Sequence, residues 1–208
     1  MLRFKLLEAG LIAGAVSFSA GYSYADDFSG RLNGFEELGT LNAQTGAVLS
    51  DGSGTVSLQL KGNSIDYTLT YSKVGTTPPQ LGTVSQAHIH FGKSRDSGGI
   101  LVFFCTNLAF TPPAHTGPTP PTCPGNSGTV KGTWTKDNVQ AILTQNVQAG
   151  DFDALVDALN SNTAYANVHT VPLPGAAAGI TAFPAGEIRG QIGSEDREDQ
   201  DDHHDNHH

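Results

Sequence analysis

The chain is poor in basic residues, in cysteine and in long apolar runs. Its 208 residues include 11 lysines and arginines against 20 aspartates and glutamates, for a formal net charge of −9. No basic stripe with interleaved aromatics occurs, which disfavours a nucleic-acid partner and an anionic membrane surface. No apolar run is long enough to span a bilayer, so the sequence predicts no membrane span.

Motifs for covalent catalysis and nucleotide binding are also missing. The sequence contains no Gly-x-Ser-x-Gly elbow and no glycine-rich phosphate loop after a strand. Hydrolase and nucleotide-binding functions therefore have no support. We predict no catalytic residue, and the sequence favours a non-enzymatic function.

The N-terminal segment has the pattern of a secretory signal peptide. Arg3 and Lys5 precede an apolar, small-residue region, and residues 23–25 supply small side chains for a cleavage site. We expect export to the periplasm or the cell exterior, with a mature chain that begins near Asp26. The predicted division is a signal peptide at residues 1–25, a folded domain at residues 26–193 and a tail at residues 194–208.

The only two cysteines are Cys105 and Cys123. In an exported protein such a pair is most simply a disulfide. It closes a loop rich in proline and threonine, and in the chain-entropy model the closure stabilises the fold by roughly 3 kcal/mol. Copper ligation by the two thiols is the alternative, but the nearby sequence offers only the isolated His115 as a companion ligand.

Most of the chain has the pattern of short strands. Residues 54–61 and 65–72 alternate apolar and polar side chains and flank a hairpin turn. These and the other candidate strands, separated by turns rich in glycine and proline, predict a mainly β fold, either a sandwich or a flattened barrel. The other candidates are residues 28–34, 84–91, 100–106, 128–134, 164–170 and 187–192.

One region has helical spacing instead. Apolar residues recur at helical intervals in residues 135–145 and 151–160, with Thr135 and Asp151 as candidate N-caps. We expect a short helical crossover here that covers one end of the β fold.

Three histidines lie in two candidate strands. His88 and His90 are two residues apart, so a strand directs both to the same face, and His169 lies in a separate strand. Three such imidazoles can form a tripod of nitrogen ligands, which suits copper or zinc. That His169 approaches the other two is a hypothesis at this point.

Four motifs occur in the order found in one family of exported domains. They are Gly-Phe-Glu-Glu at 34–37, Ala-His-Ile-His at 87–90, Tyr-Ala-Asn-Val-His-Thr at 165–170 and Gly-Glu-Ile-Arg-Gly-Gln at 186–191. Over residues 28–192 the chain resembles the CHRD (chordin-type) domain family, in its single-domain exported bacterial form. The resemblance implies an antiparallel Greek-key β-sandwich, immunoglobulin-like or superoxide-dismutase-like, and implies no particular activity. The long segment at 171–179 and the cysteine-closed loop depart from the family pattern.

Polar side chains accompany the histidines in the last two motifs. If the strands are neighbours, Asn167, Glu187 and Arg189 share the histidine face, and Glu187 can orient a ligand histidine through its second ring nitrogen. Arg189 can instead pair with Glu187 and hold it away from a metal ion. The alternative is a solvated sheet face on which the histidines only make hydrogen bonds.

The C-terminal tail carries four more histidines: His203, His204, His207 and His208. Residues 194–208 hold seven acidic residues and one arginine, a net charge of −6, which predicts disorder. The tail is either a solubilising segment or a flexible auxiliary metal chelator, and its metal affinity should fall as pH drops through about 6.5.

Three functions follow from these patterns. The first, which we favour, is an exported protein that sequesters or transfers copper through His88, His90 and His169, with zinc as the less favoured ion. The second is an extracellular interaction module for a protein or matrix partner, and a homodimer is also left open. The third is a copper oxidoreductase, which needs an open coordination position. His-x-His strands also occur in copper/zinc superoxide dismutases, but this sequence has no obvious fourth histidine ligand, no bridging histidine and no clear zinc subsite, which disfavours dismutase activity.

Overall fold

The computed structural model describes residues 27–38, 46–111 and 115–194. The predicted signal peptide and the tail histidines lie outside these residues. β-Strand is the main regular structure of the described chain, and each candidate strand of the sequence corresponds to a strand of the structure. The strands are β1 (Asp27–Asn33), β2 (Ser53–Lys61), β3 (Ser64–Ser72), β4 (Gly82–Phe91), β5 (Ile100–Thr106), β6 (Gly128–Thr135), β7 (Ala164–Pro172) and β8 (Ile188–Ser194).

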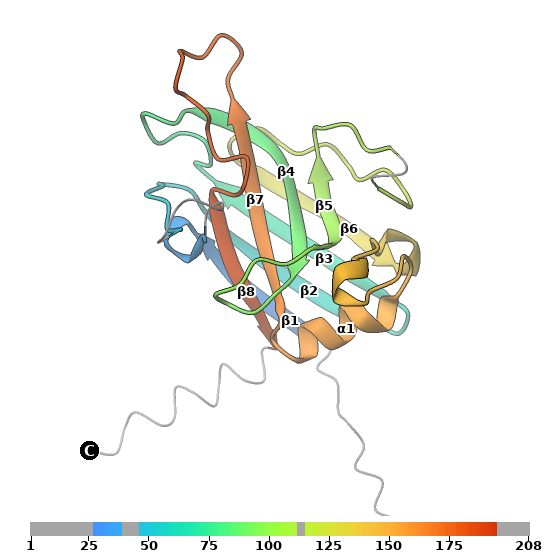
Figure 1. Ribbon diagram of the computed structural model, residues 1–208. Helices are drawn as coiled ribbons and strands as arrows, with labels where there is room; N and C mark the ends of the chain where they lie inside the picture. The colour runs from blue at the N-terminus through green and yellow to red at the C-terminus, as the bar shows by residue number, and fades with distance from the viewer. Residues whose placement is uncertain (1–26, 39–45, 112–114, 195–208) are drawn as a thin grey trace, which may run out of the picture.

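All eight strands belong to one antiparallel sheet. Their order across it is β5-β4-β7-β8-β1-β2-β3-β6. The sheet curls on itself, so that β5, β4, β7 and β8 form a layer in front of β1, β2, β3 and β6 (Figure 1). The predicted mainly β, antiparallel fold is confirmed. In place of the two separate sheets of a Greek-key sandwich, however, the layers join into a nearly closed barrel.

Close contact between β1 and β8 joins the two layers. Phe28 pairs with Ser194 and Asn33 with Arg189 across this junction. Glycine makes the approach of the two backbones possible, because a Cβ added at Gly30 would lie only 2.6 Å from the carbonyl oxygen of Gln191. The sequence alone does not reveal which glycines mark such a junction.

Side chains bridge the seam between the two edge strands, β5 and β6. The indole nitrogen of Trp134 donates to the carbonyl oxygen of Phe103 at 2.9 Å. From β3, the neighbour of β6, the hydroxyl of Tyr67 donates to the carbonyl oxygen of Phe104 at 3.3 Å. Because both donors are buried aromatics, they satisfy edge carbonyls while filling the core.

The layer formed by β5, β4, β7 and β8 is buried on both faces. Its inner face supplies apolar side chains to the core between the layers, among them Ile89, Val168 and Ile188, all with no exposed surface. Its outer face carries the three strand histidines, Asn167 and Arg189, but not Glu187, which precedes β8. That face is also buried: His88 is 1% exposed and Arg189 2%. The alternative of a solvated sheet face is therefore wrong.

The predicted crossover contains one α-helix. Helix α1 (Phe152–Asn160) begins after Asp151, whose carboxylate caps it by accepting from the amide of Ala154 at 3.1 Å. Residues 135–145 are not a helix, and this prediction is wrong. They form two short 3₁₀ turns, η2 (Lys136–Asn138) and η3 (Leu143–Gln145). The amide of Gln140 donates to the carbonyl of Leu101 on β5 rather than to a helical carbonyl. A third turn, η1 (Gly34–Glu36), follows β1.

Cys105 and Cys123 form the predicted disulfide, with their Cα atoms 4.9 Å apart. It ties the loop that follows β5 back to the end of that strand. The loop is also held by Asn107, whose side-chain nitrogen donates to the carbonyl of Cys123 at 3.2 Å. Among the described residues, no helix is long and apolar enough to cross a membrane.

Candidate metal centre

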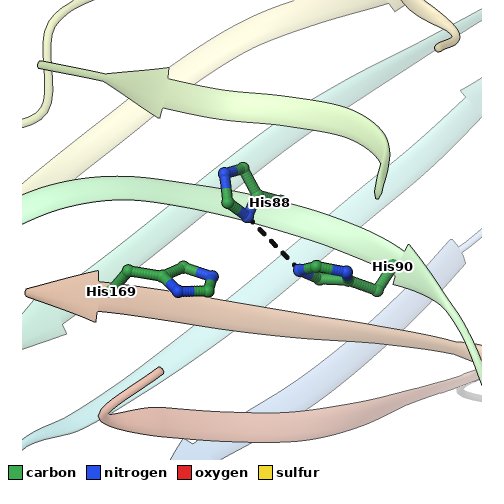
Figure 2. A group of neighbouring side chains, drawn as sticks. All are labelled: His88, His90 and His169. Atoms are coloured by element: carbon green, nitrogen blue, oxygen red, sulfur yellow. Dashed lines mark hydrogen bonds between the residues drawn. The ribbon is translucent and has the colours of Figure 1, made fainter. Parts of the chain in front are cut away.

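The strand register brings the three predicted histidines together. β4 and β7 are adjacent, with His88 opposite Asn167 and His90 opposite Tyr165. His169 lies two residues beyond Asn167, diagonally across from His88, at a separation that long side chains span. One nitrogen from each of the three histidines lies within 4.8 Å of the other two. Figure 2 shows the three rings converging from the two strands. We call these residues the histidine triad.

Backbone carbonyls orient two of the three rings. Nδ1 of His90 lies 2.9 Å from the carbonyl oxygen of Gly98, and Nδ1 of His169 lies 3.0 Å from that of Pro184. A carbonyl oxygen only accepts hydrogen bonds, so both rings carry their hydrogen on Nδ1. In the neutral rings, the lone pair on each Nε2 is then available to a ligand.

His88 completes the triad with a weak hydrogen bond. Its Nδ1 lies 3.3 Å from Nε2 of His90, and because that atom holds a lone pair, His88 is the donor. The Nε2 atoms of His88 and His169 are buried and have no hydrogen-bond partner among the described residues. Buried polar atoms without partners cost free energy. Nε2 of His169 faces the other two rings, whereas Nε2 of His88 points away from them, so Nδ1 is the nitrogen that His88 presents to the triad (Figure 2).

Burial keeps the triad neutral. It lowers the pKa of His90 to about 4 and that of His169 to about 3, and the neighbouring histidine adds to the shift at His169. The pKa of His88 is lowered well below its usual value, first by burial and then by the two other triad members. Neutral imidazole is the form that binds a metal ion.

Tyr165 lies between the triad and a buried cation. Its ring stacks on that of His90, with centroids 4.9 Å apart and planes inclined by 4°. The guanidinium carbon of Arg189 lies 3.4 Å from the centroid of the same ring. Arg189 also donates to the carbonyls of Lys93 and Asp96, both at 2.9 Å, and so holds the loop after β4 over this face.

The remaining predicted companions lie near the triad or turn away from it. Asn167 is buried beside the triad and donates to the carboxylate of Glu37. Glu187 faces another cluster, where its carboxylate accepts from the hydroxyl of Ser50 at 2.7 Å and from the amide of Gly75 at 2.9 Å. It makes no hydrogen bond to a triad histidine, and it forms no ion pair with Arg189 among the described residues. Carbonyls perform the orienting role predicted for Glu187.

A family model for the CHRD domain matches residues 28–192. The chain belongs to the CHRD-domain family. The match covers the sheet almost from end to end, and the resemblance in its motifs is confirmed. Both histidine motifs of this CHRD domain therefore lie inside the matched region. No curated protein matches the chain.

Sequence patterns missed several parts of the site. The carbonyls of Gly98 and Pro184 belong to loops, and backbone acceptors leave no signature in a sequence. Phe103 packs edge-to-face on His88 at 4.5 Å between ring centroids, and edge-to-face on His115 at 5.0 Å. His115, which appears isolated in the sequence, thus lies one aromatic ring away from the triad. Phe103 precedes the disulfide cysteine by two residues, but only the strand register reveals its position.

Proposed function

We propose that this CHRD-domain protein is exported and sequesters or transfers copper through His88, His90 and His169. The observation that carries the proposal is the convergence of three neutral imidazoles, with nitrogens within 4.8 Å of one another. Two of these rings also have buried Nε2 atoms without partners among the described residues. A bound ion would satisfy Nε2 of His169 and would use Nδ1 of His88 and Nε2 of His90, the two nitrogens that now share a hydrogen bond, with the hydrogen of His88 moved to its Nε2.

The type of ligand favours copper over the other divalent metals. Imidazole nitrogens suit copper, zinc, nickel and iron, and among divalent ions copper binds a given nitrogen site most tightly. Zinc is the less favoured ion because structural zinc sites have four ligands, whereas the cluster in the described residues has three. Calcium and magnesium, which prefer oxygen ligands, are disfavoured.

Export is supported by the disulfide and by the predicted signal peptide. Disulfides persist in oxidising compartments and are rare in the cytosol. The Cys105–Cys123 bond also occupies both cysteines of the chain, which removes thiolate ligation as an alternative. We therefore place the copper-binding role in the periplasm or outside the cell.

The test is a metal titration of the full chain in which His203, His204, His207 and His208 are replaced by asparagine. We call this the tail variant. We expect it to bind copper tightly and stoichiometrically, and we expect His90→Ala in the same background to abolish that binding. His115→Asn is the matched control, because it removes a nearby histidine outside the triad. Retained copper binding in His90→Ala, with normal circular dichroism, would contradict the assignment.

A further inference from the structure

The triad offers a bound ion no negative charge. Within the described residues, no aspartate, glutamate or cysteine joins the cluster of three histidines. The two buried carboxylates have other partners: Glu37 accepts from Asn167, and Glu187 accepts from Ser50 and Gly75. An ion bound to three neutral imidazoles therefore retains its full charge.

The surroundings do not compensate that charge. The charged groups around the triad include a cation as well as a carboxylate: the Arg189 guanidinium lies over the Tyr165 ring that stacks on His90, and the Glu37 carboxylate interacts electrostatically with Arg189. The cost of moving an ion from water into a poorly polarisable interior rises with the square of its charge. A monovalent ion therefore pays about a quarter of the cost of a divalent ion of the same size.

The number of ligand atoms at the triad also favours a monovalent copper ion over the divalent ions. Phe103 packs on His88 and Tyr165 stacks on His90 through their carbon rings, and the Tyr165 hydroxyl is engaged by the amide of Gly98 at 3.2 Å. Zn(II) prefers four ligands in a tetrahedron and Cu(II) prefers a tetragonal arrangement. Cu(I) has a filled d shell and is satisfied by two or three donors.

We propose that the histidine triad is selective for Cu(I), so that this protein holds copper in its monovalent state. The proposal rests on the proposed function and narrows it to one oxidation state. It concerns binding of an ion that arrives already reduced, and it requires no electron transfer by the protein.

Competition titrations of the tail variant under anaerobic conditions provide the first test. We expect Cu(I), measured against a chromophoric Cu(I) chelator, to bind at least about a hundredfold more tightly than Zn(II), measured against a zinc chelator. Cu(I) binding should disappear in His169→Ala and persist in His115→Asn. Comparable or tighter binding of Cu(II) at the triad would overturn the Cu(I) proposal and leave the proposed function intact, whereas comparable or tighter binding of Zn(II) would overturn both. If none of the three ions binds at the triad, both fail.

X-ray absorption of the Cu(I)-loaded tail variant provides a test that requires no triad substitution. We expect the edge shape of three-coordinate Cu(I) and a shell of nitrogen scatterers with the multiple scattering of imidazole. A four-coordinate spectrum, or a shell dominated by sulfur, would overturn the proposal even if the triad variants do not fold.

Discussion

His90 and Tyr165 lie opposite each other on β4 and β7, and their rings stack with centroids 4.9 Å apart. The tyrosine hydroxyl also accepts from the amide of Gly98 at 3.2 Å, and the carbonyl of that same glycine accepts from Nδ1 of His90. The two side chains thus share an anchor in the loop after β4. This arrangement fixes the plane of the His90 ring and directs its Nε2 toward the rest of the triad.

Substitutions at Tyr165 should separate stacking from hydrogen bonding. Tyr165→Phe keeps the ring and loses one hydrogen bond, which should lower the free energy of unfolding by about 1 kcal/mol. Tyr165→Ala also leaves a cavity and should cost roughly 3–5 kcal/mol. Copper affinity should remain near that of the parent in Tyr165→Phe and fall in Tyr165→Ala. Urea denaturation and copper titration measure the two effects, and equal affinity in both variants would show that the stack does not position His90.

Acid should destabilise the metal-free protein through the triad. The pKa values of His90 and His169 are lowered to about 4 and about 3, below the value of about 6.5 expected in the unfolded chain. Between pH 6.5 and the lowered pKa values, the unfolded chain binds more protons than the folded chain. The stability that the neutral rings contribute is therefore fully present above pH 6.5 and is lost as pH falls through this range. At pH 5 each histidine with such a lowered pKa should make the free energy of unfolding roughly 2 kcal/mol smaller than it is above pH 6.5.

The check is chemical denaturation between pH 7 and pH 4. In His169→Asn, the amide can still donate to the carbonyl of Pro184 but cannot titrate, so the loss of stability with acid should be smaller by one histidine. The matched variant is His115→Asn, which removes a half-buried histidine outside the triad. Equal slopes in His169→Asn and the parent would argue against the buried neutral His169.

Glu187 should matter for stability and little for the metal. Its carboxylate has no exposed surface and accepts hydrogen bonds from Ser50, Gly75 and Thr170. Glu187→Ala leaves these buried donors unpaired and should cost roughly 3 kcal/mol. Copper affinity of the folded fraction should stay within about threefold of the parent, which is less than 1 kcal/mol. A much larger loss of affinity would restore the orienting role that the sequence suggested.

The disulfide should stabilise the fold without contributing to the metal centre. Replacing Cys105 and Cys123 together by serine opens a loop with a sequence separation of 18. The free energy of unfolding should fall by about 3 kcal/mol in the chain-entropy model. Serine avoids new thiolate ligands, so copper stoichiometry should be unchanged at temperatures where the variant is folded. Loss of copper binding by the folded double variant would place the disulfide loop within the centre.

The part of the site that follows from local periodicity was predictable, and the part that depends on register was not. Alternation on β4 places His88 and His90 on one face, but only the pairing of β4 with β7 shows that His169 joins them. Residues 135–145 have helical apolar spacing, yet the backbone of Gln140 pairs with β5, and this tertiary contact overrides the local pattern. The anchors at Gly98 and Pro184 are backbone atoms, which no residue pattern reveals.

The sequence likewise predicted the strands of the sheet but not how the sheet closes. Strand periodicity and glycine-rich turns indicate a mainly β fold, and either a sandwich or a flattened barrel satisfies them. The choice is made where Gly30 and Gly190 let β1 and β8 approach. The outer polar face is covered separately, by the loops after β4 and β7, which contact Arg189 and His169 and make the histidines a buried cluster rather than a solvated surface.

Long-range proton–nitrogen NMR of the histidine side chains tests the central claim most directly, because it reports each imidazole nitrogen separately. In the metal-free full chain we predict neutral His90 and His169 rings with hydrogen on Nδ1. Adding Cu(I), which is diamagnetic, should shift the nitrogens of His88, His90 and His169 together at stoichiometric metal and leave His115 unchanged. Shifts confined to the tail histidines, with the triad signals unmoved, would contradict the account.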